Sequence, residues 1–249
     1  MDTSKHALGR HADLPDQRDF KFSLSRTTGA AHPIAYRAKN FGIYDQGNLG
    51  SCVGHGVTGA FRQLLAHENL PDYVGSRLGV YYGAREIENT VAVDAGASIR
   101  DGVKVVNNTG LMPEILWPYI ESAFATKPPP AAYAAAKKHI AIQYQSVDNK
   151  DYDACCRAIY QNGNLIIGIT VYESFESDVV ARNGKVPLPQ PKEQVLGGHC
   201  MRAIGYTPKN LIIANSWGTG WGDFGLCYLP REYVTNPNLA SDFWTLVRI

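Results

Sequence analysis

The apolar positions of the chain follow one repeat in its first half and another in its second half. The segments VGHGVTGAFRQLLAHEN, SRLGVYYGAREIEN and SIRDGVKVVNNTG place apolar residues three or four positions apart, which predicts amphipathic helices. The later segments HIAIQYQSVD, NLIIGITVY, CMRAIGY, LIIANSW and LCYLP are rich in β-branched residues and alternate apolar with polar positions, which predicts strands. We therefore expect an α+β fold in which a helix-rich lobe precedes a β-rich lobe.

The same pattern divides the chain into three parts. Residues 1–33 form a polar N-terminal extension with little periodicity, residues 34–125 the helix-rich lobe and residues 126–249 the β-rich lobe. The proline-rich stretch TKPPPAAYAAAKKH supplies the boundary between the lobes. A cleft between the lobes is the natural place for a site. Two roles stay open for the extension: a short latch along the cleft or a structural belt around the lobes.

Composition and charge narrow the classes of partner. The 249 residues are 45% hydrophobic, and 24 Lys and Arg balance 23 Asp and Glu, so the electrostatic footprint of a nucleic-acid-binding protein is missing. No apolar stretch approaches the ~20 residues of a membrane helix, and residues 1–30 lack the apolar core of a secretory signal. The five cysteines include no CxxC pair, and no histidine has a spacing to them that suits a zinc site. We expect a monomer without metal or cofactor that binds neither nucleic acid nor membranes.

Cys52 has the local setting of a reactive thiol. It ends the loop QGNLGSC and begins the first predicted helix. The positive end of a helix dipole favours the thiolate, and a nearby imidazolium would lower the pKa of the thiol further. Taken alone, a cysteine at such a junction is more often structural.

Two motifs in the β-rich half supply groups that could work with this thiol. In GGHC, two glycines leave room for a substrate backbone, and His199 lies at the mouth of a predicted strand. In NSWGTGWG, Asn215 can accept a hydrogen bond from an imidazole nitrogen, and an indole lying over that bond would exclude water. Each motif alone is also compatible with a purely structural role.

Together, and in the order Cys, His, Asn, the three motifs resemble those of papain and the cathepsins. QGNLGSC resembles their nucleophile loop, GGHCMRAIGY their histidine strand, and NSWGTGWGDFGLCYL their asparagine loop and the strand after it. The intervening segments YYGARE, DAGASIRDGVK, TGLMPEILWPY and IGITVYESFES resemble bacterial members of this papain-like cysteine peptidase family. The resemblance runs from about Asp45 to about Tyr228, and it implies the papain-like two-lobe fold.

The resemblance also implies a role for each matching residue. Cys52 would attack the scissile carbonyl, His199 would protonate the leaving amine, and Asn215 would orient His199. Gln46 would supply the side-chain donor of the oxyanion hole, with the backbone N–H of Cys52 as the second donor.

Three further residues are implied as substrate contacts. Gly96 lies where the family places a glycine that pairs with an extended substrate, and Gly198 would flank the same cleft. Trp217 is the indole expected beside the histidine and asparagine.

The expected activity is that of an endopeptidase acting on peptide or protein substrates through a thioester acyl-enzyme. An exopeptidase or deconjugase would use the same chemistry with one end of the cleft closed. A catalytically silent binding module or decoy is the alternative from another class, but such proteins normally lose one of the four catalytic groups, and this chain keeps them all. The family resemblance alone favours a secreted over a cytoplasmic location.

The sequence also departs from the family at several positions. Leu49 replaces a cysteine that usually anchors a disulfide, so that disulfide is expected to be absent, and Val53 replaces an aromatic residue at the edge of the cleft. Because strand residues alternate between faces, we expect the Cys200 thiol to face away from the cleft. A disulfide between Cys200 and Cys227 stays open if their strands are neighbours.

Overall fold

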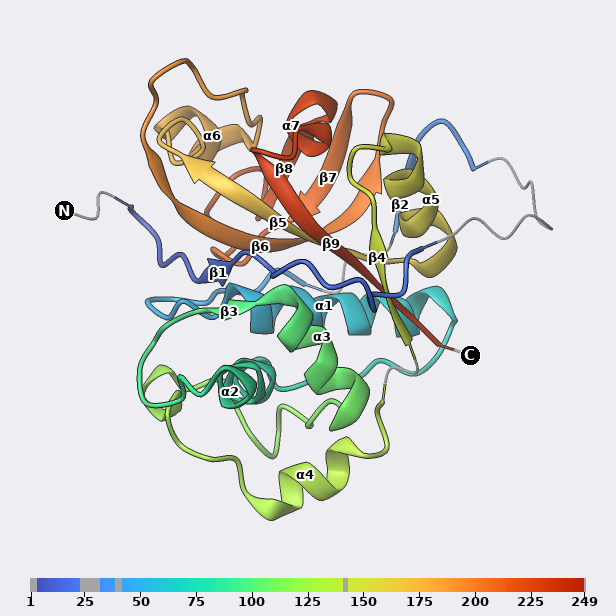
Figure 1. Ribbon diagram of the computed structural model, residues 1–249, viewed down its shortest axis with the longest axis vertical. Helices are drawn as coiled ribbons and strands as arrows, with labels where there is room; N and C mark the ends of the chain where they lie inside the picture. The colour runs from blue at the N-terminus through green and yellow to red at the C-terminus, as the bar shows by residue number, and fades with distance from the viewer. Residues whose placement is uncertain (1–3, 23–31, 39–41, 141–142, 249) are drawn as a thin grey trace.

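The protein folds into two lobes stacked one above the other (Figure 1). A computed structural model describes residues 4–22, 32–38, 42–140 and 143–248. Helices fill the lower lobe and a twisted sheet dominates the upper one, so the predicted α+β class is confirmed. The helical elements are α1 (Cys52–His67), α2 (Arg77–Glu88), α3 (Ile99–Asn108), the 3₁₀ turn η1 (Glu121–Ala123), α4 (Pro130–Ala136), α5 (Tyr152–Asn162), α6 (Asp178–Asn183) and α7 (Arg231–Thr235).

The upper lobe is built on an antiparallel sheet of seven strands. Six of them lie in the order β4-β9-β5-β6-β7-β8, and β2 pairs with β6 outside this path. A separate parallel pair joins β1 to β3. The strands are β1 (Arg10–His11), β2 (Tyr36–Arg37), β3 (Ala97–Ser98), β4 (Gln143–Val147), β5 (Leu165–Tyr172), β6 (Val195–Tyr206), β7 (Asn210–Ala214), β8 (Leu226–Pro230) and β9 (Ala240–Val247).

Helix α1 lies at the junction of the lobes, packed on α2 and α3 from one side and on β6 from the other. Glycines allow this close approach. A Cβ atom at Gly56 would lie 2.8 Å from the sulfur of Cys200, and one at Gly59 would lie 2.5 Å from Nη1 of Arg202. The sequence GHGVTG therefore lets the helix that begins at Cys52 rest directly on the sheet.

The five cysteines are all free, which answers the open question of a Cys200–Cys227 disulfide, and one expectation about them is wrong. Cys200 packs with Cys52 in the apolar core between the lobes, whereas Cys227 belongs to the core of the β lobe. Strand β7 also separates β6 from β8, so no Cys200–Cys227 disulfide forms. The Cys200 thiol does not face away from the cleft, because the face of β6 that it occupies is the face covered by α1.

The short helix α4 packs with the lower lobe, although it follows residue 125. Its residues Ala132 and Ala136 share a small apolar cluster with Met112. The boundary between residues 125 and 126 stays a prediction about domain organisation, and α4, which follows that boundary in sequence, packs with the helical lobe. Within the described ranges, no helix is long and apolar enough to cross a membrane.

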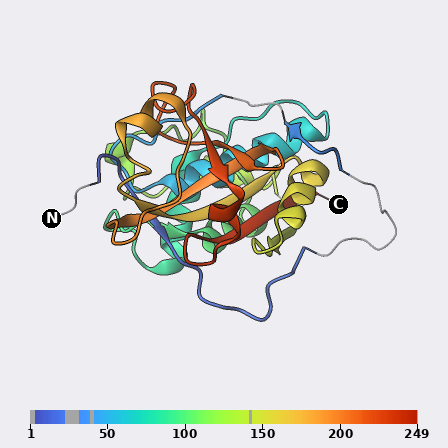
Figure 2. The same cartoon turned by 90° about the horizontal axis from the view of Figure 1, so that it is seen from above.

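The N-terminal segment runs between the two lobes along one side of the molecule (Figures 1 and 2). It begins in the cleft, where β1 pairs with β3 of the lower lobe. It then reaches the upper lobe, where Phe22 N donates to Ser146 O at 2.7 Å and Ser146 N donates to Phe20 O at 2.7 Å. The segment consequently contacts both lobes.

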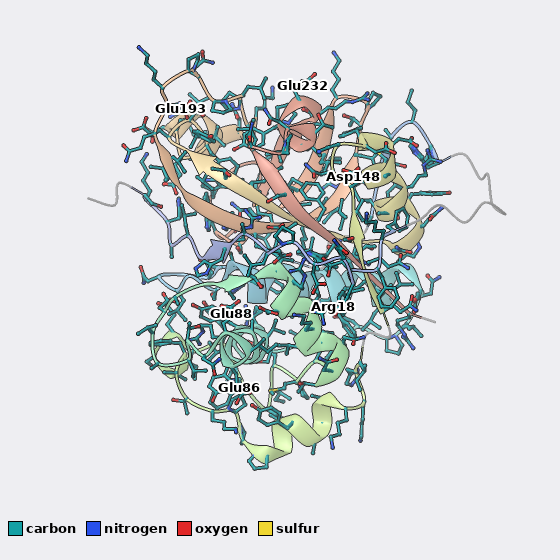
Figure 3. The ribbon with its side chains drawn as sticks, viewed as in Figure 1. Arg18, Glu86, Glu88, Asp148, Glu193 and Glu232 are labelled. Atoms are coloured by element: carbon teal, nitrogen blue, oxygen red, sulfur yellow. The ribbon has the colours of Figure 1, made fainter. Side chains whose placement is uncertain are left out.

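Charged side chains cover the outside of both lobes, and Arg85 is an exception. Figure 3 labels Glu86, Asp148 and Glu232, all of which are exposed. Arg85 is fully buried in α2, where its guanidinium donates to Val91 O at 2.9 Å and to Val93 O at 3.0 Å. It also donates to the carbonyl of Phe124 and lies 4.0 Å from the ring centroid of Tyr81. One side chain thereby holds two loops onto α2.

Replacing Arg85 by leucine should destabilise the protein strongly. The substitution leaves the part-buried carbonyls of Val91, Val93 and Phe124 without their donor, and loss of a buried charged partner from such an arrangement typically costs about 3 kcal/mol or more. Urea unfolding should show this loss, while the matched change Arg182→Leu at an exposed position of α6 should alter the free energy of unfolding by less than ~0.5 kcal/mol. Equal unfolding free energies for the two variants would contradict the structural role of Arg85.

Candidate active site

Cys52 is the first residue of α1 and is fully buried. Burial raises the pKa of its thiol to about 11, against the opposing effect of backbone N–H groups from Cys200, Gly9 and Val53 that approach the sulfur. Gly9 belongs to the N-terminal segment, so this segment covers the thiol. In this closed arrangement the thiol is neutral at pH 7.

The His199 ring is bonded to Asn215, as the sequence predicts. His199 lies in β6, and its Nε2 is 2.7 Å from Oδ1 of Asn215, just beyond β7. The same Oδ1 accepts from the backbone N–H of Ser216 at 2.8 Å, so it is an acceptor and we assign the proton to Nε2. Nδ1 has no hydrogen-bond partner among the described residues. Burial lowers the pKa of His199 to about 4, against the opposing bond from Asn215, and the ring is neutral here.

Trp217 lies between two imidazole rings. Its indole stacks on His199 with ring centroids 4.7 Å apart and an interplanar angle of 26°. His6 of the N-terminal segment also stacks on Trp217, with ring centroids 4.0 Å apart and an interplanar angle of 6°. Trp221 meets the same indole edge-on at 5.0 Å. The indole therefore shields the His199 side of the site from water, and in this state it is itself covered by His6.

Gln46 is fixed through both ends of its amide. Its Nε2 donates to Leu49 O at 2.8 Å and to Ala7 O at 3.0 Å, and its Oε1 accepts from Oγ of Ser216 at 2.7 Å. The backbone N–H of Gln46 donates to Ser216 O at 2.9 Å. A carbonyl oxygen of the N-terminal segment thus occupies the donor that the sequence assigns to the oxyanion.

The two predicted substrate-contacting glycines contact this same segment. A Cβ at Gly96 would lie 2.2 Å from Gly9 O, and one at Gly198 would lie 2.2 Å from Arg10 O. Gly96 also has φ +80°, a conformation that favours glycine. Next to it, Ala97 N donates to Gly9 O at 2.8 Å. Residues 6–10 therefore approach five of the seven predicted site residues: Trp217, Gln46, Cys52, Gly96 and Gly198. The other two, His199 and Asn215, are bonded to each other beside Trp217.

Sequence reasoning missed a hydrogen-bonded group behind the nucleophile loop. The hydroxyl of Tyr119 donates to Gln46 O at 2.7 Å and lies 2.6 Å from Oγ of Ser51. Nδ1 of His55 is 3.0 Å from Ser51 O, and burial lowers the pKa of that imidazole to about 3. This group ties the backbone of Gln46 to the residue before Cys52. Tyr119 ends the segment TGLMPEILWPY, so the resemblance of that segment to the family was the one sequence signal that could have pointed to this residue.

Glu176 was also missed, because nothing in the sequence links it to the N-terminus. It is 4% exposed and accepts from Lys5 N at 2.5 Å and from Oγ of Ser4 at 3.1 Å. Burial acts to raise its pKa, but hydrogen bonds from His6, Lys5 and Ser4 hold the pKa below the usual value. Glu176 thereby holds the beginning of the segment beside Trp217.

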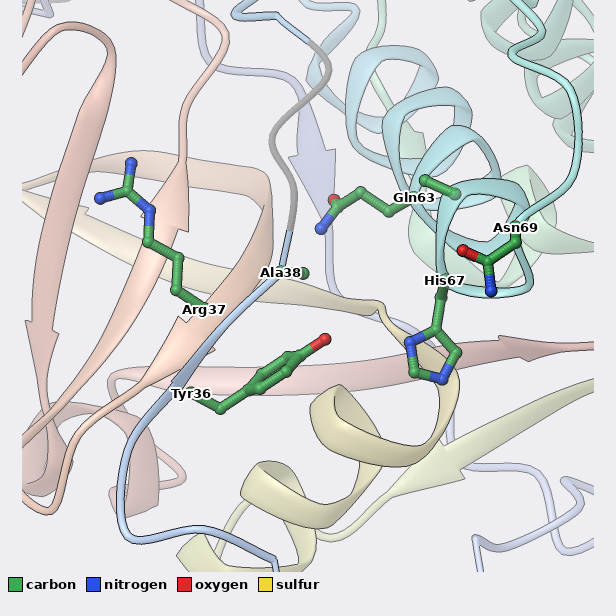
Figure 4. A pocket seen from close by; sticks show the side chains of 7 residues that line it. Tyr36, Arg37, Ala38, Gln63, His67 and Asn69 are labelled. Carbon is green, nitrogen blue, oxygen red and sulfur yellow. The ribbon is translucent and has the colours of Figure 1, made fainter.

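The cavity shown in Figure 4 lies far from these groups. It has a volume of about 200 Å³ and is lined in part by Tyr36, Gln63, His67 and Asn69. His67 ends α1, and a helix of 16 residues is ~24 Å long, so this hollow is a helix length from Cys52. In the part of the chain that is described, no three His, Cys, Asp or Glu side chains form a group suited to a metal ion.

Comparisons with known proteins agree with this arrangement. Residues 34–245 match the family described as papain family cysteine protease. An uncharacterized peptidase C1-like protein of Acanthamoeba polyphaga mimivirus is 38% identical over 280 residues, covering 100% of this chain and 90% of the relative. A cathepsin L-like peptidase of Aedes aegypti is 28% identical over 214 residues, covering 80% of this chain and 58% of the relative.

Solved structures give the same result. Xylellain, a cysteine protease from Xylella fastidiosa, is 31% identical, with a TM-score of 0.92 over 98% of this chain and 97% of that one. A procathepsin B from Trypanosoma congolense shares the fold, with a TM-score of 0.74 over 97% and 86% of the two chains at 13% identity. The chain therefore belongs to the papain family of cysteine proteases and is a peptidase that acts on peptide or protein substrates.

Proposed function

We propose that the protein is a cysteine endopeptidase that is held in a latent state by its own N-terminal segment. The observation that supports this proposal is the path of residues 4–13. The segment passes Trp217, Gln46, Cys52 and Gly96 in turn, and chain continues beyond the nucleophile in both directions. A cleft through which a peptide passes at both ends suits an endopeptidase better than an exopeptidase.

The proposed chemistry begins when the segment leaves the cleft. Water then reaches Cys52 and His199, and the N-terminus of α1 favours the thiolate while the imidazole takes the proton. The thiolate attacks the scissile carbonyl, and the oxyanion is bound by Nε2 of Gln46 and the N–H of Cys52. Oxyanion donors of this kind each contribute about 2.7–4 kcal/mol to transition-state stabilisation.

His199 then gives its proton to the leaving amine, and a thioester is left on Cys52. Water, deprotonated by the same imidazole, hydrolyses the thioester. Asn215 keeps the ring oriented through the 2.7 Å bond to Nε2. The retention of all these groups argues against a silent binding module.

The segment resists cleavage in the closed state because of what it presents to the nucleophile. The backbone N–H of Gly9 faces the sulfur, and the nearby carbonyl of Ala7 is bonded to Gln46. A thiolate needs a carbonyl carbon in its line of attack, and an N–H group offers none. The neutral state of the buried thiol acts in the same direction.

We assign the latch to residues 4–12 and a structural belt to residues 13–22. Oδ2 of Asp13 accepts from Nε1 of Trp244 in the upper lobe at 2.8 Å, and its Oδ1 accepts from the N–H of Arg100 in the lower lobe at 3.1 Å. Arg100 also binds the carboxylate of Asp19, with Nε to Oδ1 at 3.0 Å. These contacts join the lobes without touching the nucleophile.

Cys52→Ala should abolish peptide cleavage. We expect hydrolysis of a mixed fluorogenic peptide library, under reducing conditions, to fall to the uncatalysed background, because the neighbouring Cys200 is fully buried and burial raises the pKa of its thiol well above the usual value. The matched variant Cys227→Ala, a buried thiol of the β-lobe core, should keep its turnover. Turnover that survives in Cys52→Ala would rule out the proposed nucleophile.

Gly9→Ala in the full chain should activate the enzyme. The added Cβ would lie 1.9 Å from Gly50 O, a backbone atom that cannot move aside easily. Overpacking of this kind costs about 1–3 kcal/mol, so initial rates should rise about tenfold. Leu14→Ala, at a side chain that is 80% exposed, should leave the rate unchanged. If Gly9→Ala is no more active than the unmodified chain, residues 4–12 do not limit activity.

Acid should open the latch. The closed form holds the pKa of His199 at about 4, below the ordinary value of ~6.5. Above pH ~6.5 the thiol and the imidazole together hold one proton in both forms, so pH leaves closure unchanged there. Between pH ~6.5 and ~4 the open form takes up a proton that the closed form excludes, so closure weakens as the pH falls. Glu176, whose pKa is also lowered in the closed form, acts in the same direction at still lower pH.

This dependence can be measured by the rate at which iodoacetamide labels Cys52. The Gly9→Ala variant serves as the open reference, because it shares the intrinsic pH dependence of the thiol. The rate of the unmodified chain divided by that of the variant should be lowest above about pH 7 and approach one near about pH 4.5. A ratio independent of pH would mean that His199 is not desolvated by the segment.

A further inference from the structure

The side chain of Arg10 fills a pocket in the β lobe immediately beside the nucleophile. Its guanidinium is paired with the carboxylate of Asp242 and donates to Oγ of Ser241. Both members of the ion pair are buried, with 6% of the Arg10 side chain and 14% of the Asp242 side chain exposed. The preceding residue, Gly9, is the one whose N–H faces the Cys52 sulfur. The pocket therefore opens next to the place where a scissile bond would lie.

Two glycines make room for this long side chain. A Cβ at Gly168 would lie 2.6 Å from Nε and 2.7 Å from Cζ of Arg10. A Cβ at Gly198 would lie 3.3 Å from Cδ of the same side chain. The two glycines belong to the neighbouring strands β5 and β6, which pair with each other along their length. The walls of the pocket are thus backbone, and Asp242 supplies the carboxylate at its end.

The backbone around Asp242 directs that carboxylate into the pocket. Asp242 has φ +58°, a conformation that is uncommon and strained for a residue with a side chain. It lies at a register shift between β5 and β9, where Gly168 pairs with Ser241. Oδ2 of Asp242 also accepts from Oγ of Ser241 at 3.2 Å and from the N–H of Asp13 at 3.0 Å. The carboxylate is held in place whether or not a cation is present.

Departure of the segment would remove the cation and leave the carboxylate. A buried carboxylate without a partner is unfavourable, so the empty pocket attracts a group that replaces the guanidinium. Arginine matches both acceptors, since its planar fork can donate to a carboxylate and a hydroxyl at once, whereas the ammonium of lysine is a point charge on a narrower stem.

We propose that Asp242, with Ser241, forms the floor of the main specificity pocket and selects arginine in the substrate. This proposal rests on the peptidase function proposed above and names its substrate class: peptides with arginine at the second residue before the scissile bond. This position follows from the direction of the segment. His6 stacks on Trp217, beside the imidazole that protonates the leaving amine, so residues on the other side of Cys52 lie where the acyl part of a substrate binds, and the segment runs opposite to a substrate. Gln46 binds the carbonyl of Ala7, and Ala97 binds the carbonyl of Gly9 two residues along, at the edge where the pocket opens. Arg10 is the internal stand-in for the substrate side chain.

The test uses the full chain with Gly9→Ala and Arg10→Ala, which releases the segment and empties the pocket. A fluorogenic library varied at the first four positions before the scissile bond should give kcat/KM about tenfold or more higher for arginine than for leucine at the second position, with lysine between them. Adding Asp242→Asn should remove this preference, so that the ratio of kcat/KM for arginine to kcat/KM for leucine approaches one. Adding Asp72→Asn, an acidic residue of an exposed ion pair with Arg62, should change nothing.

A preference for arginine that survives Asp242→Asn would overturn the proposal, as would selection of an apolar residue at the second position. Arg10→Gln in place of Arg10→Ala repeats the test with a side chain of similar length, should the alanine variant fold poorly.

Binding separates this proposal from the peptidase function itself. With Cys52→Ala added, the released chain should bind acetyl-Gly-Arg-Ala-amide about tenfold or more tightly than acetyl-Gly-Leu-Ala-amide in calorimetry, and Asp242→Asn should equalise the two. If no peptide is cleaved in the library but this difference in binding is found, the pocket is established and the peptidase proposal fails. Equal affinities for the two peptides would contradict the proposed arginine pocket.

Discussion

Burial of the Cys52–His199 pair beneath the N-terminal segment is the constraint on which the state of the site depends. A thiol and an imidazole in water can exchange a proton to become an ion pair, but removing both from water favours their neutral forms. The structure has both residues fully buried, with the thiol pKa raised and the imidazole pKa lowered. The segment thus acts on the chemistry as well as on access to the cleft.

The two-lobe arrangement makes this burial possible. Cys52 and His199 are far apart in sequence, and the elements that carry them come together because α1 lies on β6 through its glycines. Each lobe keeps its own apolar core, and the nucleophile and the histidine lie where the lobes meet. A short extended segment placed along this junction can therefore cover the nucleophile, its acid/base partner and the oxyanion donor together.

The candidate site residues could be named from the sequence because their signals are local. Gln46, Cys52, His199 and Asn215 each lie in a short motif whose glycines and aromatic residues report the turn or strand that presents the side chain. The α+β order followed from the change of hydrophobic period. The orientation of Cys200 could not be predicted from alternation alone, because alternation says which residues share a face of β6 and not that α1 covers that face.

The contacts of the N-terminal segment could not be predicted from the sequence for a different reason. Arg10 and Asp242 are 232 residues apart, and their pairing requires both the parallel pairing of β1 with β3 and a left-handed residue at a register shift in β9. Neither feature has a signature in the sequence. Glu176 meets Lys5 and His6 under the same kind of condition, because two segments that carry no motif come together only in the folded chain.

The proposed latency and the proposed selectivity depend on the same ion pair, that of Arg10 with Asp242. The pocket that is proposed to choose the substrate also anchors the segment that keeps substrate out, so a stronger carboxylate site would select arginine better and close the enzyme more tightly. A substrate competes with a tethered copy of its own side chain, and the tether gives that copy a high effective concentration. Opening must therefore come from outside the pocket. Desolvation of His199, together with the contacts of Glu176 at the far end of the segment, provides the free energy that pH can change.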